Sequence, residues 1–384
     1  MLAAKRIVII AGEESGDMHA AHLIKQLKLS LPNIHISGIG GKHMQEAGAE
    51  LICDLARYGV TGLSEIICHL KVLRKAFSAI KRHLNQQKTD LLILVDYPGF
   101  NLRLAKYAKN RLGLKIIYYI SPQIWAWKAN RIHLIKQCVD RMAVILPFEK
   151  AIYEKAGVRV SFVGHPLVDT ISSNSDLISQ RKILNLPAGS KILALLPGSR
   201  THEIERHMPI LRDTATLLHQ HYPDLHCVIP IASTIDQVQI KSYFSSSNLP
   251  FTLIQGKAVD CMDAADFVIV ASGTASLECA LLGKPMCIIY KSSFFTYLAA
   301  MKLIKVKFLG LCNLLSNTMM VPEFLQYDCN AIELARYITQ FYDDPSQPHR
   351  MQSQLSALKN LLSIEKSDCS LIELIESELI EIHS

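Results

Sequence analysis

The sequence predicts an α/β protein made of two similar domains, each with a parallel sheet and covering helices. Short apolar runs, typical of buried strands, alternate along the chain with segments of helical periodicity. A strand that leads through a small polar turn into a helix occurs near the beginning, at Lys191–His207 and at Phe267–Leu282. Such a unit places the N–H groups of a helix N-terminus beside a strand end, which favours anion binding.

Size and composition exclude several classes of protein. The chain has 384 residues, of which 49% are hydrophobic, so two ordinary domains fit and disorder is not expected. The net charge of +7 suits anionic small molecules or an anionic membrane surface, and we expect no nucleic-acid partner. The ten cysteines form no closely spaced pair, which indicates a reducing cytoplasm and no cysteine metal or redox motif. The apolar run Ile7–Ala11 is too short for a signal peptide.

The domain boundary is expected at a polar stretch, Ser172–Ser179. This places one domain at residues 1–170 and a second at residues 171–345, with ligand-facing loops and a cleft between them. A helical tail over residues 346–384 is expected to pack across the domains or onto a second subunit, as in a homodimer. The apolar segment Phe294–Leu315 is interrupted by three lysines, so we do not expect it to span a membrane.

The first domain opens with the strand Ile7–Ala11, followed by the segment GEESGD at Gly12–Asp17 as a turn and a helix over His19–Leu29. The glycine spacing fits neither a dinucleotide fingerprint nor a P-loop. We expect Ser15, Gly16 and Asp17 to face a ligand; equally, the segment could be an acidic turn that caps the helix.

A basic amphipathic helix is predicted over Leu63–Lys88, after a strand at His35–Gly40 and a helix at Lys42–Ala47. It carries one apolar stripe and six cations, and such a helix can lie on an anionic membrane surface. The competing interpretation is a packed helix with a solvated basic face. The stripe comprises Ile66, Leu70, Leu73, Phe77, Ile80 and Leu84, and the cations are Lys71, Arg74, Lys75, Lys81, Arg82 and Lys88.

Asp96 lies where the apolar strand of Thr89–Asn101 ends. Ligands of open α/β sheets bind beyond the carboxyl ends of strands, so Asp96 is a candidate general base. Alternatively, it caps the helix predicted over Leu102–Arg111.

Both tryptophans of the chain, Trp125 and Trp127, lie in SPQIWAWK, which follows the predicted strand Leu114–Ile120. Gln123 and Trp125 could line a sugar or acyl pocket; packing at the domain edge is the alternative. Further strands are predicted at Arg141–Leu146 and Val160–Val163.

The second domain contains two candidate anion sites. The strand Lys191–Leu196 runs into a turn in which Gly198 and Ser199 offer backbone amides and Arg200 offers a guanidinium. The strand Phe267–Val270 runs into a second turn and a helix, Ala275–Leu282, before another strand at Met286–Tyr290. The second turn and helix start comprise Ser272, Gly273, Thr274, Ala275 and Ser276.

Glu278 follows this second turn by about one helical turn, on the same face. A carboxylate there can accept hydrogen bonds from a ribose diol while the turn binds a diphosphate. The competing interpretation is an ordinary capped helix with a solvated acid. Other strands of this domain are predicted at Leu225–Ile231 and Thr252–Ile254.

Taken together and in order, these motifs resemble the lipid-A-disaccharide synthases over nearly the whole chain. The motifs are GEESGD at 12–17, VDYPGFN at 95–101, SPQIWAWK at 121–128, LPFEKAIYEKAGV at 146–158, FVGHPLVD at 162–169, LALLPGSR at 193–200, ASGTASLECALLGKPM at 271–286 and NLL at 313–315.

The resemblance implies a GT-B fold, with two Rossmann-like domains facing a cleft. It also implies an inverting transfer that joins UDP-2,3-diacylglucosamine to 2,3-diacylglucosamine 1-phosphate, giving the β-1,6 lipid A disaccharide 1-phosphate and UDP. The family is peripheral to the cytoplasmic face of the inner membrane and needs no metal or other cofactor. The alternatives are a GT-B transferase with another acceptor and a UDP-sugar epimerase.

Site roles follow from this resemblance. Asp96 would be the base and Arg200 would offset the charge of the departing UDP, which the turns and Glu278 bind. Asn313 is a substrate-binding candidate through the NLL motif alone. The family often has a second acid where this chain has Gly99, so that acid is not required here. The chain contains no Asp-x-Asp sequence, in agreement with metal independence.

Overall fold

The computed structural model describes residues 5–55, 63–125, 129–171, 176–232, 235–245, 247–293, 307–363 and 367–380, with the backbone alone over 63–70. The chain divides into two compact units: Met1–Pro166 with Leu362–Ser384, and Leu167–Leu361. The chain therefore passes between the units after residue 166, where the sequence suggested 170. The expected tail of residues 346–384 is divided between the two units.

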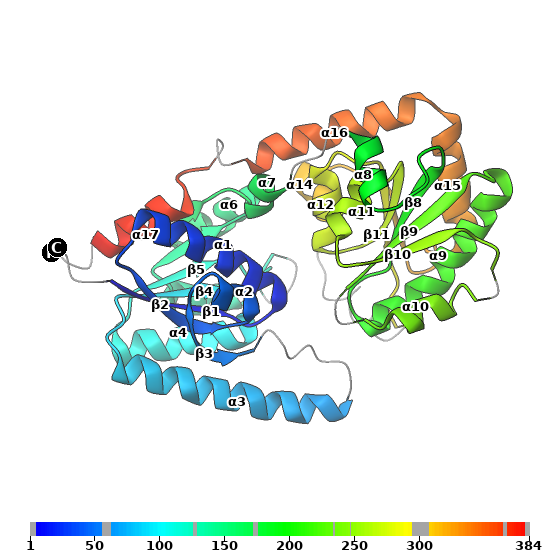
Figure 1. The fold of residues 1–384 in the computed structure, drawn as a ribbon. Coiled ribbons are helices and arrows are strands. Elements are labelled where there is room, and N and C mark those ends of the chain that lie inside the picture. Colours follow the sequence, from blue (N-terminus) through cyan, green and yellow to red (C-terminus); the bar gives the residue numbers. More distant parts are fainter. Residues whose placement is uncertain are drawn as a thin grey trace. The chain divides into compact units, whose positions relative to one another are not determined.

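A parallel sheet forms the centre of the first unit (Figure 1). Its strand order, β3-β2-β1-β4-β5-β6-β7, reverses direction between β1 and β4, as in doubly wound folds. Strand β3, which forms one edge of the sheet, was missed because its apolar run, Leu51–Cys53, is only three residues long. The strands are β1 (Arg6–Ala11), β2 (His35–Gly40), β3 (Glu50–Asp54), β4 (Leu91–Val95), β5 (Ile116–Tyr119), β6 (Arg141–Val144) and β7 (Val160–Phe162).

Two helices of this unit begin earlier than the sequence suggested. Helix α1 begins at Glu14, so the prediction of a turn over Gly12–Asp17 is wrong; two acids in its first turn complement the helix dipole. Helix α4 begins at Pro98, a residue that favours a first helical turn. The helices are α1 (Glu14–Ser30), α2 (Lys42–Glu46), α3 (Leu63–Gln86), α4 (Pro98–Leu112), α5 (Arg131–Cys138), α6 (Pro147–Lys155) and α17 (Leu371–Ile380).

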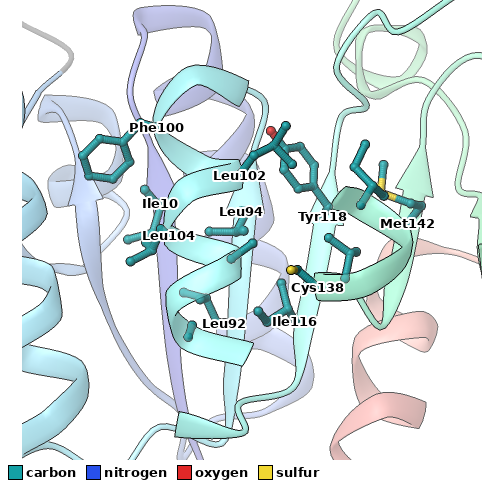
Figure 2. Packing of buried hydrophobic residues seen from close by; sticks show 14 of the residues in the cluster. Ile10, Leu92, Leu94, Phe100, Leu102, Leu104, Ile116, Tyr118, Cys138 and Met142 are labelled. Atoms are coloured by element: carbon teal, nitrogen blue, oxygen red, sulfur yellow. The ribbon is translucent and has the colours of Figure 1, made fainter. Parts of the chain in front are cut away.

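The core of the first unit lies between the central strands and the helices on one face of the sheet. In Figure 2, Leu104 of α4 points toward Ile10 and Leu94 of the neighbouring strands β1 and β4. Tyr118 and Met142 continue the same layer over β5 and β6. This layer fixes the carboxyl ends of β1, β4 and β5 relative to one another, and the candidate base lies at those ends.

The apolar stripe of α3 belongs to this core over the part whose side chains are described. Ile80 and Leu84 are buried in the cluster, and Leu73 and Phe77 pack against it. Ile66 and Leu70 lie outside the described side chains. The stripe is therefore covered by protein from Leu73 onward, as the packed-helix interpretation expected, while most of the cations on the opposite face are exposed.

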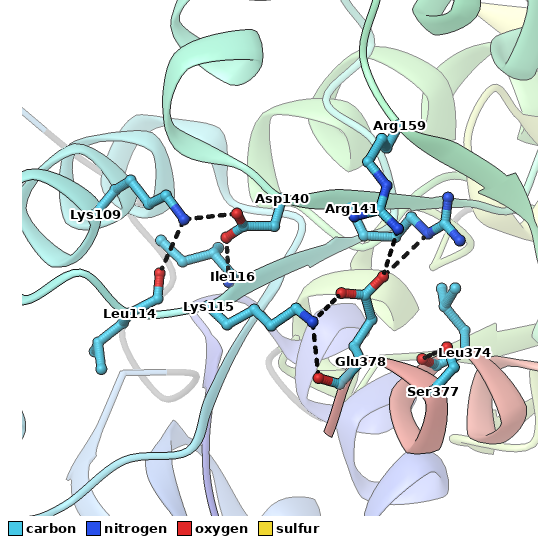
Figure 3. Close-up of polar contacts among 10 residues, drawn as sticks. All are labelled: Lys109, Leu114, Lys115, Ile116, Asp140, Arg141, Arg159, Leu374, Ser377 and Glu378. Carbon is cyan, nitrogen blue, oxygen red and sulfur yellow. Dashed lines mark hydrogen bonds and ion pairs between the residues drawn. The ribbon is translucent and has the colours of Figure 1, made fainter. Parts of the chain in front are cut away.

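The C-terminal helix α17 is attached to the sheet of the first unit by an ionic cluster around a buried carboxylate (Figure 3). Glu378 is 1% exposed, and its carboxylate lies 2.8 Å from Lys115 Nζ, 3.4 Å from Arg141 Nε and 3.7 Å from Arg159 Nη2. The three cations lie at or just before the amino ends of β5, β6 and β7. One carboxylate near the end of the chain thus faces three neighbouring strands.

The sheet of the second unit is also parallel and has the order β10-β9-β8-β11-β12-β13, with its reversal between β8 and β11. Strand β13 was missed because its three residues are too short a run to recognise. The strands are β8 (Lys191–Leu196), β9 (Leu225–Ile231), β10 (Phe251–Gln255), β11 (Phe267–Ala271), β12 (Met286–Tyr290) and β13 (Glu323–Leu325).

Helices cover this second sheet, and one long helix, α9, follows the first strand. None of the described helices is long and apolar enough to cross a membrane. Most of Phe294–Leu315, for which a span was considered, lies outside the described residues. The helices are α7 (Pro166–Thr170), α8 (Leu177–Ile183), α9 (Thr201–His221), α10 (Gln237–Ser242), α11 (Ala258–Ala264), α12 (Thr274–Leu281), α14 (Leu311–Ser316), α15 (Ala331–Asp343) and α16 (Ser346–Leu362).

Candidate active site

Asp96 lies at the point where the order of the first sheet reverses. Val95, the last residue of β4, pairs with Ala11 at the end of β1, so Asp96 and Gly12 leave neighbouring strands together. In doubly wound sheets, ligands bind at the carboxyl ends of the two strands that flank this reversal. The predicted position of Asp96 at a strand end is therefore confirmed, and it is the end that such folds use for binding.

The backbone at Asp96 has an unusual conformation. Asp96 and Tyr97 both have left-handed φ angles, 45° and 46°, which non-glycine residues rarely adopt. Hydrogen bonds hold this conformation: the Asp96 N–H donates to Tyr119 O at 3.0 Å, and its carbonyl accepts from Tyr118 Oη at 2.6 Å and Asn101 Nδ2 at 2.7 Å. Strain that persists because its surroundings enforce it is common at functional sites.

Tyr97 also explains why the preceding motif needs a glycine. A Cβ atom on Gly12 would lie 2.1 Å from Tyr97 Cδ1, so the aromatic ring rests against the bare backbone of residue 12. The two motifs GEESGD and VDYPGFN, separated by about eighty residues in the sequence, are therefore in contact. Any side chain at position 12 would displace the residue next to the candidate base.

The carboxyl group of Asp96 has a raised affinity for protons. Burial raises its pKa to about 6, the negative charge of Glu13 adds to this, and a hydrogen bond from the Tyr97 N–H acts in the opposite direction. The N-cap of α4 is Tyr97, and no side chain caps it. The alternative that Asp96 caps the following helix is therefore wrong, and the carboxylate remains available for proton transfer.

A second buried carboxyl group, Glu149, was missed by sequence reasoning. It lies in the first turn of α6, is 1% exposed, and accepts a hydrogen bond from Trp125 Nε1 at 3.0 Å. Burial raises its pKa to about 7, against the lowering effect of the hydrogen bonds from Trp125 and Ser121, and the charge of Asp96 adds to the rise. The sequence offered one signal for Glu149: it is a single acid that follows an apolar strand and the residues Leu-Pro-Phe.

Glu149 orients Trp125, one of the predicted pocket residues. The indole is half-buried and its ring meets Phe148 edge-on, with centroids 5.2 Å apart. Gln123, two residues earlier, is exposed. Trp127 lies outside the described residues. Both Trp125 and Gln123 follow β5, the strand next to that of Asp96.

In the segment Ser15–Asp17, the Asp17 side chain binds the start of another helix of the first unit. The Asp17 carboxylate is 1% exposed and accepts hydrogen bonds from the N–H groups of Gly41, His43 and Met44 at 2.7 to 3.1 Å. It therefore caps α2, a helix distant in sequence, which no local pattern revealed. Gly16 is buried and Ser15 is exposed.

The N-terminus of α12 is uncapped and is the candidate anion site of the second unit. It follows β11, which pairs with β8 at the reversal of this sheet, with Val270 opposite Leu196. The N-cap is Gly273, no side chain caps the helix, and Gly273 and Thr274 are exposed. The first N–H groups of a helix lack intrahelical acceptors, so those at Thr274 and Ala275 can bind an anion.

The serines beside these amides are engaged with the backbone. Ser276 is buried and its hydroxyl donates to Gly273 O at 2.7 Å, while the Ser272 hydroxyl donates to Leu309 O at 3.3 Å. Glu278 is half-buried, and burial raises its pKa. No hydrogen bond or ion pair of this carboxylate is present within the described part of the chain, so it can accept from a ligand.

The turn after β8 was also predicted to offer backbone amides to an anion, and here the structure differs. The N–H groups of Ser199 and Arg200 donate to Glu203 Oε2 at 3.2 and 3.3 Å, so of the two amides predicted to face a phosphate, at Gly198 and Ser199, that of Ser199 already has an internal acceptor. Gly198, at φ 113°, is required because a Cβ atom there would lie 2.3 Å from Glu203 Oε2. An acid three residues into a helix reaches back to the N-cap in this way in a capping box.

Arg200 itself remains available. Its side chain is 65% exposed and meets Glu203 only at 3.5 Å. In the turn after β8, the guanidinium can therefore bind a phosphate oxygen, whereas the amides of Ser199 and Arg200 are engaged by Glu203.

Asn313 is fully engaged within the protein. It is 0% exposed; its amide donates to Val321 O and Glu323 Oε1, and its Oδ1 accepts from the N–H groups of Met320 and Val321. Glu323 in turn accepts from the N–H groups of Leu309 and Gly310. Because Leu309 O accepts from Ser272, Asn313 organises the segment that contacts the α12 turn.

Comparison with known proteins shows which family the chain belongs to. A family model described as lipid-A-disaccharide synthetase matches residues 7–379. Lipid-A-disaccharide synthase 1 of Legionella pneumophila (strain Lens) is 68% identical over 378 residues, which cover 98% of both chains. The lipid-A-disaccharide synthase of Geobacter metallireducens is 40% identical over 358 residues and 93% of both chains.

The chain belongs to the lipid-A-disaccharide synthase family. The resemblance drawn from the sequence motifs is thereby confirmed. Solved structures with a similar fold include the UDP-GlcNAc 2-epimerase of Neisseria meningitidis bound to UDP-GlcNAc, with a TM-score of 0.64 at 13% identity over 98% of this chain and 100% of that one. The calicheamicin glycosyltransferase CalG4 has a TM-score of 0.60 at 12% identity over 100% of both. At these identities the likeness shows the fold, which is the predicted GT-B fold.

Proposed function

We propose that the chain carries out the reaction of its family, with Asp96 as general base and the N-terminus of α12 as the site of the departing diphosphate. The reaction joins UDP-2,3-diacylglucosamine to 2,3-diacylglucosamine 1-phosphate and yields the β-1,6 lipid A disaccharide 1-phosphate and UDP. The observation that carries the proposal is the position of Asp96 at the reversal of the sheet. Its backbone is strained and the pKa of its carboxyl group is raised.

Proton removal is the role assigned to Asp96. The acceptor hydroxyl must lose its proton as it attacks the anomeric carbon of the donor, because its oxygen becomes the bridging oxygen of a glycosidic bond. A carboxyl group with a pKa of about 6 is mostly ionised at neutral pH and binds a proton better than an ordinary aspartate does. A pKa near the working pH favours both requirements of a general base.

Charge stabilisation is the role of the second unit. As the bond to the anomeric carbon breaks, negative charge grows on the diphosphate. The free amides at Thr274 and Ala275, the dipole of α12 and the exposed Arg200 guanidinium can offset it. Glu278 would accept hydrogen bonds from the ribose hydroxyls. We propose that these groups replace a metal ion, and that the reaction needs no cofactor.

The remaining substrate contacts are proposed on the same basis. Gln123 and Trp125 would contact the acceptor, because they follow the strand beside that of Asp96. Ser15 is exposed near the same reversal, whereas Gly16, Asp17 and Asn313 would act through the segments that they hold. These roles stay predictions.

The acylated substrates suggest a membrane setting. We propose peripheral association with the anionic cytoplasmic face of the inner membrane through the exposed cations of α3: Lys71, Arg74, Lys75 and Arg82. The homodimer also stays a prediction.

The proposal is tested by incubating the purified chain with both substrates and a chelator, followed by mass spectrometry of the lipids. A disaccharide 1-phosphate with stoichiometric UDP is expected. A reaction without acceptor should leave the donor unchanged; donor epimerised or hydrolysed at the full rate without acceptor would contradict the proposal. Dependence on an added divalent ion would contradict the metal-free step alone.

A further inference from the structure

His207 is a buried histidine of α9 with both ring nitrogens engaged. It is 0% exposed; Nδ1 lies 2.6 Å from Pro197 O, and Nε2 accepts a hydrogen bond from the Lys291 N–H at 3.0 Å. Because Lys291 N–H can only donate, Nε2 carries no proton, and Nδ1 is the donor to Pro197 O. The ring is therefore the neutral Nδ1–H tautomer.

The two partners of His207 lie on either side of the candidate diphosphate site. Pro197 is the first residue after β8, and Lys291 is the first after β12. In the sheet, β8 and β12 flank β11, the strand that leads into the N-terminus of α12. The ring thus connects the outer two of three neighbouring strand ends, and the middle one carries the open amides.

The two hydrogen bonds of His207 hold two different segments. The segment after β8 is expected to contact the ligand, and the segment after β12 makes a further hydrogen bond within the protein. Pro197 directly precedes Gly198–Arg200, whose guanidinium is expected to meet a phosphate. Beyond Lys291, the Ser292 N–H donates to Gln326 Oε1 at 2.6 Å. In the same way, the Ser272 N–H donates to Ile289 O at 3.0 Å, which connects the α12 turn to β12.

We propose that His207 is a positioning residue of the UDP-sugar site, which sets the spacing of the loops after β8 and β12 around the α12 N-terminus. It touches no reacting atom and acts through Arg200 and the α12 turn. The inference rests on the proposed function, because it assumes that this site binds UDP.

The same geometry makes UDP binding sensitive to protonation of this ring. An imidazolium would present a second N–H to the Lys291 N–H, and the two donors would repel each other. The charged groups that influence the ring are Glu203 and Arg206 of its own helix and Lys291 at the end of β12; Tyr290 contributes an uncharged ring 6.3 Å away. Burial, the largest effect, lowers the pKa of His207 below its ordinary value of 6.5, so the bridge persists above that pH and is lost as the pH falls through the lowered pKa.

Two conservative variants separate the two bonds. In His207→Asn the amide nitrogen can replace Nδ1 toward Pro197, and in His207→Gln the amide oxygen can replace Nε2 toward Lys291. We expect each to weaken UDP binding about three- to five-fold and His207→Leu, which replaces neither, at least about ten-fold, because a hydrogen bond contributes roughly a factor of five. The donor KM should rise in the same order while the acceptor KM stays unchanged.

The measurements are UDP affinity by titration calorimetry between pH 5 and 8, steady-state kinetics and melting temperature. A matched control is His226→Asn, since His226 is a half-buried histidine whose ring is also hydrogen-bonded, to Thr252 Oγ1 at 2.8 Å, but between β9 and β10. It should leave UDP affinity unchanged. The ratio of wild-type to His207→Gln affinity should decline as the pH falls through the lowered pKa of His207.

The outcomes distinguish the two claims. If the wild type does not bind UDP, the proposed function fails with the inference. If it binds UDP and the folded Asn, Gln and Leu variants bind UDP as tightly at every pH, the inference alone is overturned. A fall in melting temperature with unchanged UDP affinity would also overturn it, since His207 would then serve stability only.

Discussion

At the scale of single residues, two of the candidate site residues have unusual surroundings. Asp96 combines left-handed backbone geometry with a raised pKa, and Glu278 is a half-buried carboxylate with no hydrogen-bond or ion-pair partner among the described residues. Both properties are costly to a folded protein, and both are explained if a substrate supplies the missing interactions.

Asp96→Asn should lower kcat by a factor on the order of 10² to 10⁴, since the amide has nearly the same shape but cannot accept the proton. UDP affinity should stay within about three-fold of wild type, because the base contributes nothing to that site. In the wild type, kcat/KM should rise with pH through about 6, where the carboxyl group ionises, and then level off. Near-normal turnover in the Asn variant would remove Asp96 from the mechanism.

Glu278→Ala and Arg200→Ala should separate binding from catalysis. The first should raise the donor KM about ten- to hundred-fold, as two hydrogen bonds from ribose to a carboxylate are lost. The second should lower kcat as well, because diphosphate charge is greatest in the transition state. Arg212→Ala, in the helix that Arg200 precedes but paired with Asp213, is the matched control and should change neither parameter. If either site variant shows wild-type kinetics, that residue lies outside the donor site.

At the scale of elements, α3 has two different faces. Its apolar stripe packs into the core from Leu73 onward, while Arg74, Lys75 and Arg82 on the other face are exposed. Lys81 lies 4.2 Å from the centroid of the Tyr107 ring and so belongs to the packing of the domain. Any membrane contact over this part of the helix is therefore electrostatic.

Replacing Lys71, Arg74, Lys75 and Arg82 with Glu should strongly reduce binding to vesicles that contain anionic lipid. Each cation near such a surface contributes about 1 kcal/mol, and salt screens the effect, so wild-type binding should weaken as salt is raised. Activity on detergent-solubilised substrates should persist. Sedimentation of the folded variant with vesicles at the wild-type level would show that α3 makes no membrane contact.

At the scale of the whole molecule, the last helix completes the first unit. Residues 362–384 return to the unit that the chain left after residue 166. Glu378 is the buried anion that three cations at the amino ends of the sheet surround, as Figure 3 shows. Lys115 additionally donates to the Glu378 carbonyl at 2.9 Å.

Glu378→Gln should destabilise the first unit by about 1 to 3 kcal/mol, because the hydrogen bonds and ion pairs of a buried carboxylate are lost while the three cations keep contact with solvent. Differential scanning calorimetry or denaturant unfolding of the full chain measures this. Glu376→Gln, a half-buried neighbour on the same helix, is the control and should lie within about 1 kcal/mol of wild type. An unchanged transition in Glu378→Gln would mean that α17 is attached by its apolar contacts alone.

Features that depend on nearby residues were accessible from the sequence. The strand, turn and helix that carry the α12 amides follow one another directly, and Asp96 follows an apolar strand directly. Apolar runs predicted β1, β2, β8, β9, β11 and β12 to within one residue. Periodicity and turn chemistry are local properties, and the order of the motifs along the chain was enough to identify the family.

Only the tertiary structure decided which polar groups are already satisfied. Glu203 occupies the amides after β8, Asp17 caps α2, and Asn313 organises the segment beside Ser272. His207 and Glu149 gave no local signal of their roles, because their partners are Pro197, Lys291 and Trp125 on other elements. When a polar side chain has several donors or acceptors within reach, the packing of distant segments decides which of them it bonds. The residues next to it in the sequence do not.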